Sequence, residues 1–566
     1  MAETLISAGV LARENDQSFI TQGPVTVGAA IIGPTAKGPV EIPTVVTSYS
    51  EYQNKFGSTI TSGSNVYSYF TSIAAYNYFQ NGGETLLVSR VVNGAYTPAV
   101  TTLDGEESAV SVTFKTIGEG ILMNSSSSVN TDGSMDSGSA DNVRWEVLNS
   151  NTGSGTFDLL VRRGNDTTND KSVLETWTNL SLDPFSSNYV AKRIGDQTST
   201  YTADGTSYYL QTSGAYPNAS RYIRVSAVNA TTPNYLDNSG VAKSAYTASI
   251  PVAQSGGFIS ATGTVKDAAK FYDEITSTDT QGLVGADYAN MINLLSNSDD
   301  YKFNVLITPG LYDADYTTQL TSIISNTQNR GDNLFILDPV KHGATVTAVT
   351  TQAASRNTSY AASYWPWVQV IDPDTGRQVW VPASTLMAGV FAYNDSVSEP
   401  WFAPAGINRG GLGQVVRPER KLAQATRDAL YTNKVNPIAS FPGTGVVVYG
   451  QKTLQTKSTA LDRVNVRRLL IAMKSYIAGV AQNLVFEQNS AATRNNFLAQ
   501  VNPYLEGIQQ KQGLYAFKVV MDETNNTADV IDRNELIGQI YVQPTKTAEY
   551  IYLDFNVTPT GVAFPA

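Results

Sequence analysis

The chain has 566 residues, more than a single hydrophobic core serves, so we expect three or four domains. Its net charge of -11 excludes a protein whose main task is to bind nucleic acid, because phosphate backbones require concentrated Lys and Arg. Cysteine is absent, which excludes disulfides, thiolate metal sites and cysteine nucleophiles. Charged residues make up only 15% of the chain, which suits burial of large surfaces against neighbouring molecules and equally suits many polar loops.

The N-terminal residues 1–22 predict an extended arm. Their apolar side chains follow no sustained period, and Gly23-Pro24 comes next. At ~3.3 Å per residue this arm would reach ~70 Å at most, although an N-terminal strand on the chain's own sheet is the simpler alternative. The start of the chain lacks the basic and apolar regions of a secretory signal, and no stretch has the ~20 apolar residues that span a membrane. We therefore expect no membrane insertion. The apolar residues of the arm include Leu5, Ile6, Val10 and Leu11.

Residues 25–92 alternate between strand and helix patterns. Apolar runs at 25–32, 44–47 and 86–92 predict strands. Ser48 and Glu51 form a capping box that opens a helix ending near Phe56. A second helix is predicted from Val66 to Gln80, before Asn81-Gly82-Gly83. This segment is therefore predicted to be α/β.

The composition changes to Ser, Thr, Asn and Gly from about residue 97 to residue 256. Alternating segments at 143–147 and 156–161 predict a β-hairpin. We interpret this region as an all-β insertion with exposed loops.

The α/β pattern returns after residue 300. Strands are predicted at 303–310 and 333–339, with a helix over 316–327 between them, which implies a parallel, right-handed crossover. A helix near 344–356 and a strand over 365–371 follow. A doubly wound or three-layered sheet is the natural packing.

The last hundred residues predict two amphipathic helices and a strand meander. Apolar residues from Val466 to Leu484 and from Phe497 to Ile508 recur at intervals of three and four. Strands are predicted at 515–521, 536–542 and 549–557, the last being an edge or a loose end. One face of that last strand carries Ile551, Leu553, Phe555 and Val557.

A search for catalytic or metal-binding residues finds no constellation of them. His342 is the only histidine, and no phosphate-binding loop motif occurs. Asp372 and Asp374 read as a hairpin tip. Arg463, Arg467 and Arg468 flank a helix, where a solvated or intrachain ion-paired role is the default and a basic rim facing an acidic partner is the alternative. We expect no enzyme, no cofactor and no metal site.

Short motifs follow one another in order from residue 28 to residue 489. They include residues 28–39 (GAAIIGPTAKGP), 78–83 (YFQNGG), 364–367 (YWPW), 401–405 (WFAPA), 450–454 (GQKTL), 464–469 (VNVRRL) and 485–489 (VFEQN). The series resembles the contractile tail sheath family of myovirus-type phages. Each motif is weak alone, but the ordered series covers nearly the whole chain. The sequence departs from the family's usual motif at Val435-Asn436-Pro437-Ile438.

The resemblance implies an α/β and α+β multi-domain fold. Its parts would be a subtilisin-like α/β core domain without protease activity, a β-rich outer insertion and a C-terminal α+β domain with exchangeable terminal strands. The implied division is an arm at 1–22, an α/β segment at 23–95, the insertion at 96–254, the subtilisin-like domain at 255–455 and the inner domain at 456–566.

The resemblance also implies function and partners. The chain would form hexameric rings stacked in a helical sheath around a tail tube, with a baseplate and a tail terminator as further partners, in a virion tail assembled in the host cytoplasm. The two terminal segments would be the exchanged strands. Candidate tube-facing residues, as a hypothesis, are Arg463, Arg467, Arg468, Lys474, Arg494 and Lys511.

Two alternatives stay open. The chain could be the sheath of a phage-derived contractile injection system or bacteriocin, which genomic neighbours would distinguish. From another class, it could be a secreted hydrolase with a β-rich accessory domain, which the lack of a leader and of a nucleophile motif disfavours.

Overall fold

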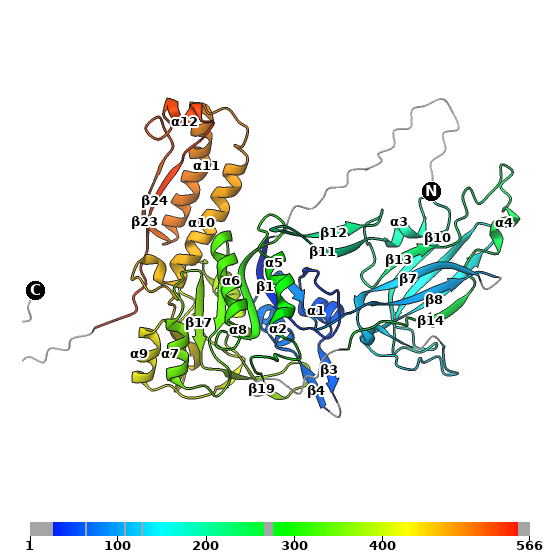
Figure 1. Ribbon diagram of the computed structural model, residues 1–566, viewed down its shortest axis with the longest axis horizontal. Helices are drawn as coiled ribbons and strands as arrows, with labels where there is room; N and C mark the ends of the chain where they lie inside the picture. The colour runs from blue at the N-terminus through cyan, green and yellow to red at the C-terminus, as the bar shows by residue number, and fades with distance from the viewer. Residues whose placement is uncertain (1–25, 63–64, 107–108, 126–127, 265–274, 553–566) are drawn as a thin grey trace, which may run out of the picture.

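The computed structural model describes residues 26–62, 65–106, 109–125, 128–264 and 275–552. The molecule is elongated (Figure 1), with an α/β body between a β-rich insertion and a C-terminal unit of helices and a hairpin. The mixed α/β, multi-domain architecture predicted from the sequence is therefore observed.

An eight-stranded sheet forms the centre of the body. Its six inner strands are parallel, and the two outermost strands run antiparallel to their neighbours. Strands β5, β16 and β17 are buried at every residue, as expected for a sheet covered on both faces. In spatial order the strands are β2 (Thr44–Val46), β5 (Leu86–Arg90), β1 (Thr26–Gly33), β15 (Lys302–Tyr312), β16 (Leu334–Asp338), β17 (Ala361–Trp365), β21 (Val435–Phe441) and β22 (Gly445–Val448).

Helices pack around this sheet and complete the main hydrophobic core. Ser48 caps α1 by accepting a hydrogen bond from the Glu51 backbone, as its sequence predicts. Helices α2 and α8 approach closely at Gly389, where a Cβ would lie 2.8 Å from the Asn77 carbonyl oxygen. The helices of the body are α1 (Tyr49–Phe56), α2 (Phe70–Gln80), the 3-10 turn η2 (Gly285–Tyr288), α5 (Ala289–Leu294), α6 (Thr317–Arg330), α7 (Val346–Ala354), α8 (Ser384–Val397) and α9 (Gln424–Thr432).

Two segments of the body differ from their predictions. The helix predicted from Val66 begins at Phe70, because residues 59–62 and 65–68 pair as a hairpin instead. The strand predicted over 365–371 is two strands in different sheets, since Pro366 between them has no N–H to continue a ladder. The strands concerned are β3 (Thr59–Ser62), β4 (Asn65–Ser68) and β18 (Val368–Ile371), which pairs with β19 (Gln378–Val381) and β20 (Val415–Pro418).

The insertion has its own hydrophobic cluster, built by two small antiparallel sheets. The predicted hairpin is confirmed as β8 and β9. Tyr201 and Leu210 of the β11–β12 hairpin pack against the core of the body. The elements are β6 (Pro98–Asp104), β7 (Val110–Glu119), η1 (Ile121–Met123), β8 (Val143–Asn151), β9 (Thr156–Arg163), β10 (Val173–Ser181), α3 (Val190–Ile194), β11 (Thr198–Asp204), β12 (Ser207–Ser213), β13 (Ile223–Val228), α4 (Ser244–Thr247) and β14 (Gln254–Gly257).

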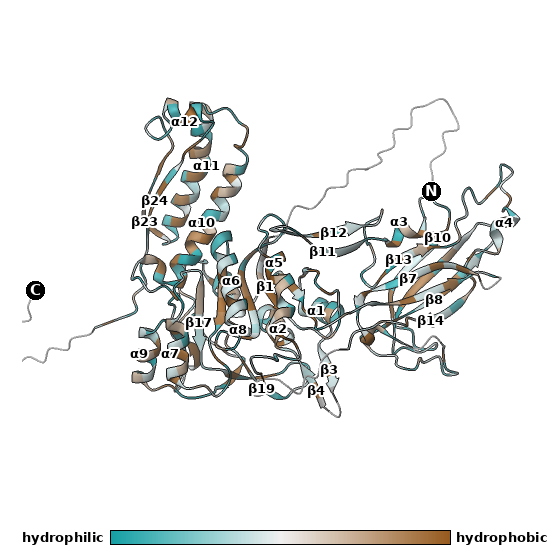
Figure 2. Cartoon of the chain, viewed as in Figure 1, coloured by the Kyte–Doolittle hydropathy of each residue, from teal (hydrophilic) through white to brown (hydrophobic). Residues whose placement is uncertain are grey.

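Hydropathy differs between the body and the C-terminal helices (Figure 2). Strand β1 and its neighbours are mostly apolar, whereas polar and apolar residues alternate along the two long C-terminal helices. In the described ranges, no helix is both long enough and apolar enough to cross a bilayer. The C-terminal elements are η3 (Ala460–Asp462), α10 (Val464–Gln482), α11 (Ala491–Gln510), β23 (Leu514–Val520), α12 (Ala528–Asp532) and β24 (Gln539–Pro544).

Candidate functional site

The C-terminal unit, residues 464–552, is built on the two predicted amphipathic helices, which the structure confirms as α10 and α11. Their apolar faces meet in a hydrophobic cluster separate from the core of the body. Val501 and Leu505 are fully buried there, and the rings of Tyr476 and Tyr504 stack with centroids 3.8 Å apart. The packed helix pair therefore offers an apolar surface on which another element can pack.

A two-stranded hairpin, β23–β24, lies on this surface. Phe517 and Val519 of β23, with Ile540 and Val542 of β24, face the helices and join their cluster. Within the described part of the chain each strand pairs only with the other. Both outer edges therefore present backbone N–H and C=O groups without a strand partner, which is the arrangement that accepts an added strand.

The third strand of the predicted meander is not formed over its described part. Residues 549–552 have no regular structure, and Tyr550, Ile551 and Tyr552 are exposed. The prediction is wrong for these residues because a strand requires a neighbouring strand, and the described chain brings none beside them. The other residues predicted to mediate strand exchange lie outside the described residues: Leu5, Ile6, Val10, Leu11, Leu553, Phe555 and Val557.

A carboxylate fixes the root of this C-terminal segment to the body. Glu549 accepts two hydrogen bonds from Arg463, at 2.7 Å from Nε and 2.9 Å from Nη2. It also accepts from the Tyr431 hydroxyl at 2.9 Å and from Gln451 Nε2 at 3.2 Å. Burial, followed by the charge of Glu549, raises the pKa of Tyr431, so this hydroxyl remains a donor. The chain is therefore held at Glu549 and leaves the body beyond it (Figure 1).

Two further contacts hold the segment just before Glu549. Thr545 Oγ1 donates to the Gln512 carbonyl at 2.7 Å, and Gln451 Nε2 donates to Thr547 Oγ1 at 2.6 Å. Gln451 itself is buried. Side-chain hydrogen bonds, and not strand pairing, therefore hold the chain between β24 and Glu549.

Three of the candidate tube-facing arginines lie in the interior of the chain. Arg467, Arg468 and Arg494 are buried, so these three guanidinium groups do not form a surface for a partner. Arg467 lies over the Tyr360 ring at 3.9 Å and donates to Ser359, and burial lowers its pKa. This is the intrachain arrangement that the sequence left as the default for Arg467 and Arg468.

Arg468 and Arg494 each have a defined partner in the chain. Arg468 pairs with Asp395 at 2.5 Å and lies over the Phe391 ring. Arg494 donates to Asn489 Oδ1 at 3.1 Å. The first of these contacts ties α10 to α8 of the body.

The remaining candidates, Lys474 and Lys511, are exposed. Lys511 pairs with Glu399 at 2.6 Å, while Lys474 donates to the Tyr360 hydroxyl at 3.3 Å. Arg463 is the residue that binds Glu549. The tube-facing role of these three side chains stays a prediction.

Sequence reasoning missed the Glu549 site. Glu549 is separated from Arg463 by 86 residues and from Tyr431 by 118, so no local spacing connects them. The available signal was a lone carboxylate just ahead of the apolar alternation at 551–557. Only the fold of the body brings its partners together.

His342 and Asp374, whose side chains could take part in catalysis, make packing and hydrogen-bond contacts within the chain. His342 packs against the rings of Trp367 and Trp380, with centroids 5.5 Å and 5.1 Å away. Asp374, in the predicted hairpin tip, accepts hydrogen bonds from Tyr49 at 2.5 Å and Gln53 at 2.8 Å, which dock the tip on α1. Over the described residues, no group of three His, Asp or Glu side chains is placed to hold a metal ion.

One buried acid has a strongly shifted pKa. Asp338, at the end of β16, is buried, and this desolvation raises its pKa to about 7. Its oxygens accept from Ser384 Oγ at 2.5 Å and from the Ser384 backbone at 3.1 Å, which works in the opposite direction. The carboxyl therefore joins β16 to the start of α8.

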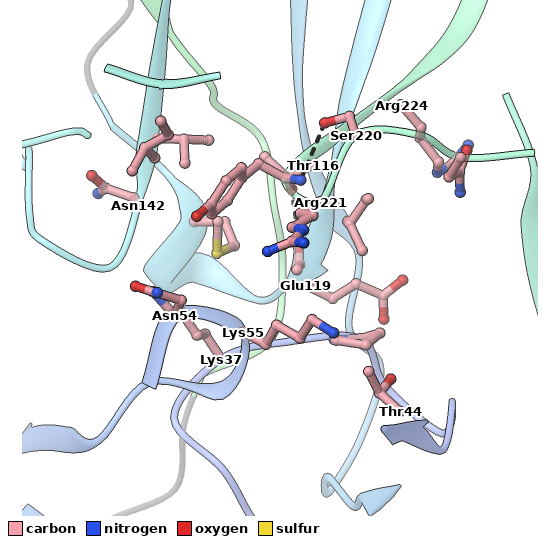
Figure 3. Close-up of a pocket in the computed structure, with 18 of the residues that line it drawn as sticks. Lys37, Thr44, Asn54, Lys55, Thr116, Glu119, Asn142, Ser220, Arg221 and Arg224 are labelled. Carbon is pink, nitrogen blue, oxygen red and sulfur yellow. Dashed lines mark hydrogen bonds between the residues drawn. The ribbon is translucent and has the colours of Figure 1, made fainter. Parts of the chain in front are cut away.

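A cavity of about 360 Å³ lies where the insertion meets the body (Figure 3). Lys37, Asn54 and Lys55 reach it from the body. Thr116, Glu119, Asn142 and Arg221 reach it from the insertion. It is remote in the chain from the C-terminal unit.

Comparison with known families identifies two adjacent domains. Residues 281–454 match the phage tail sheath protein central domain, and residues 456–558 match the phage tail sheath C-terminal domain. The second match includes α10, α11, the hairpin and Glu549.

Two curated relatives are similar over part of their length. The tail sheath protein of Vibrio phage KVP40 is 43% identical over 208 residues, which are 37% of this chain and 31% of that protein. The tail sheath protein of Enterobacteria phage T4 is 42% identical over 185 residues, which are 33% of this chain and 28% of that protein. The chain thus aligns with less than a third of the length of either relative.

A solved structure shares the fold. The crystal structure of the sheath tail protein Lin1278 from Listeria innocua superimposes with a TM-score of 0.52 at 11% identity, covering 92% of this chain and 96% of that one. At this identity the likeness concerns the fold alone.

Proposed function

We propose that this chain, which belongs to the phage tail sheath family, is the structural subunit of a contractile sheath that polymerises helically around a tail tube. On contraction the sheath would drive the tube through the host envelope for genome delivery. The observation that carries the proposal is the run of sheath central and C-terminal domains over residues 281–558, which includes the open-edged hairpin β23–β24. The chain is a component of a virion tail, assembled in the host cytoplasm.

Subunits would be linked by exchanged terminal strands. The open edges of β23 and β24 would accept the N-terminal arm and the C-terminal strand of neighbouring subunits. If each added strand makes about six to eight backbone hydrogen bonds at about 1 kcal/mol net, a link stabilises the lattice by several kcal/mol. The contacts of Glu549 support this assignment, because they fix the point from which the C-terminal strand departs.

Contraction would then rearrange contacts between subunits rather than within them. Trp401 Nε1 donates to the Lys511 carbonyl at 3.0 Å, and the Arg468–Asp395 and Lys511–Glu399 pairs also join the C-terminal unit to the body. These ties favour movement of the two as one rigid part. The transition would run from an extended lattice to a compact one with more buried interface, without nucleotide hydrolysis.

The chain would divide into five parts. The arm would comprise residues 1–22, the first α/β segment 23–95, the outer insertion 96–254, a subtilisin-like domain 255–455 and the inner domain 456–566. The parallel sheet of the body supports an α/β core of this kind. Stacked hexameric rings, the tail tube, the baseplate and the terminator are the proposed partners. Lys474 and Lys511 are the remaining exposed candidates for the tube-facing surface.

Negative-stain microscopy of the purified full chain tests this function. We expect hollow tubes with a helical lattice, alone or with the tail tube protein present. A chain that stays monomeric in both conditions would contradict the proposal. Capsid genes next to the coding sequence would indicate a phage tail, and their absence an injection machine.

A truncation tests the strand link separately. A chain ending at Tyr552 keeps Glu549 and its contacts but lacks the segment that would be exchanged. We expect this chain to fold, by circular dichroism, and to form no tubes. Tubes as abundant as those of the full chain would exclude the C-terminal segment as the link.

A further inference from the structure

The cavity between the body and the insertion has the dimensions of a small-molecule site. Its volume of about 360 Å³ lies within the usual range of ~300 to 1,000 Å³ for ligand pockets. One wall comes from residues 37–55 of the body, and the opposite wall comes from residues 116–119, 140–143 and 218–224 of the insertion (Figure 3). A ligand bound there would touch both parts of the molecule.

The charge of this cavity is opposite to that of the chain. The chain as a whole carries a net charge of -11. The cavity is lined by more cationic side chains than carboxylates, so its formal charge is positive. The cationic residues are Lys37, Lys55, Arg163, Arg221 and Arg224, and the carboxylates are Glu119 and Asp141.

Intrachain partners account for only part of this charge. Lys37 pairs with Asp141 at 3.1 Å, and Lys55 pairs with Glu51 at 3.0 Å. The guanidinium groups of Arg163, Arg221 and Arg224 make no ion pair or hydrogen bond with any described residue. In Figure 3 the Arg221 side chain extends from the insertion toward the wall that carries Lys37 and Lys55. Cationic side chains therefore line the cavity on both walls.

Burial disfavours the charged form of two of the cations in the walls. Burial lowers the pKa of Lys37, and the nearby charge of Arg163 lowers it further against the pull of Asp141. Burial also lowers the pKa of Arg224, which Glu119 partly offsets. A bound anion would offset this cost, because an opposite charge nearby favours the cationic form of each group.

We propose that this cavity binds a small phosphate-bearing anion with at least two negative charges, which bridges the insertion and the body. Guanidinium groups favour phosphate because their fork of N–H donors matches two phosphate oxygens at once. The cavity also has room for more than one phosphate group. This site is independent of the strand edges in the C-terminal unit.

Titration calorimetry with inorganic pyrophosphate, on the unassembled full chain without magnesium, tests the proposal. We expect one site per chain and an upward shift of the thermal midpoint. Arg221→Ala should weaken binding about ten-fold or more, since a hydrogen bond from a charged donor is lost. Arg221 is exposed and has no side-chain partner among the described residues, so this variant should fold.

Lys192→Ala/Arg193→Ala is the matched control, because it removes exposed positive charges from the same insertion outside the cavity. We expect it to bind pyrophosphate like the unmodified chain. Equal losses in Arg221→Ala and in the control would indicate non-specific attraction and overturn the proposal. So would the absence of binding at millimolar pyrophosphate. Binding of citrate with equal affinity would overturn the preference for phosphate.

Discussion

The body and the C-terminal unit treat the edges of their sheets differently. In the central sheet of the body, the edge strand β2 is only three residues long. The opposite edge strand, β22, is covered by the loop that contains Leu412, whose backbone N–H donates to the Val446 carbonyl. Short or covered edges resist pairing with other chains. In the C-terminal unit both strands of the hairpin have an open edge. The hairpin of the C-terminal unit is therefore more open to an added strand than the central sheet of the body.

The first test of this comparison is in the core of the body. Phe335 is fully buried in β16, at the middle of the eight-stranded sheet. Phe335→Ala should lower the free energy of unfolding by about 3 to 5 kcal/mol, because it leaves a cavity in a closely packed interior. Urea unfolding measures the loss. Phe185→Ala is the control, since Phe185 is 75% exposed and its removal should change little.

The second test is in the core of the C-terminal unit. Leu505→Ala should cost about 2 to 3 kcal/mol, the lower part of the range for Leu, because a two-helix layer can partly close the gap. Leu505 is fully buried, whereas Leu498 of the same helix is half-buried and serves as the control with a smaller loss. We expect limited proteolysis to cut the C-terminal unit first. Cleavage of the body at the same rate would show that the body and the C-terminal unit unfold together.

The third test uses pH to perturb the body alone. The pKa of Asp338 is raised from its ordinary value of 3.8 to about 7 in the folded chain, so the folded state holds a proton that the unfolded state has lost. The contribution is therefore fully present below pH 4 and is lost as pH rises toward 7. Between pH 5 and pH 7 the loss should be about 2 kcal/mol.

Asp338→Asn should remove this pH dependence, because the amide does not titrate. Thermal unfolding from pH 4 to pH 8 measures it, with Asp299→Asn as an exposed control. An unchanged pH profile in Asp338→Asn would mean that another group is responsible.

The smallest expected effect on folding concerns the anchor of the C-terminal segment. Arg463→Gln removes the paired hydrogen bonds to Glu549 and should cost about 1 kcal/mol, since the pair is partly exposed. Proteolysis after residue 544 should become faster, and tube formation should weaken. Lys457→Gln is the matched control, because Lys457 is exposed and has no side-chain partner among the described residues. Equal proteolysis of both variants would argue against an anchor.

Much of the fold was predictable where the pattern was local. The capping box at Ser48, the alternation at 143–161 and the periodic helices after Val466 all formed as expected. Each depends on neighbours within a few residues. The errors occurred where local signals competed, as at Val66, where a helical spacing overlaps a hairpin.

The candidate site was predictable only in outline. The sequence predicts a strand at 515–521, which the structure forms at Leu514–Val520, but its lack of a third neighbouring strand depends on the path of the whole chain. The arginines illustrate the same limit: a helical wheel places Arg467 and Arg468 on a flank, and packing against Tyr360 and Phe391 buries them.

The sequence by itself indicated the tail sheath family, because the resemblance rests on an ordered series of motifs and does not depend on any single position. It also determined the helices and most strands, since hydrophobic period and capping act over short distances. Only the tertiary structure decided which edges stay open, which charges are buried and where Glu549 is held. These features depend on contacts between segments about a hundred residues apart in the chain, such as those of Glu549. A local sequence pattern does not show which distant segments will meet.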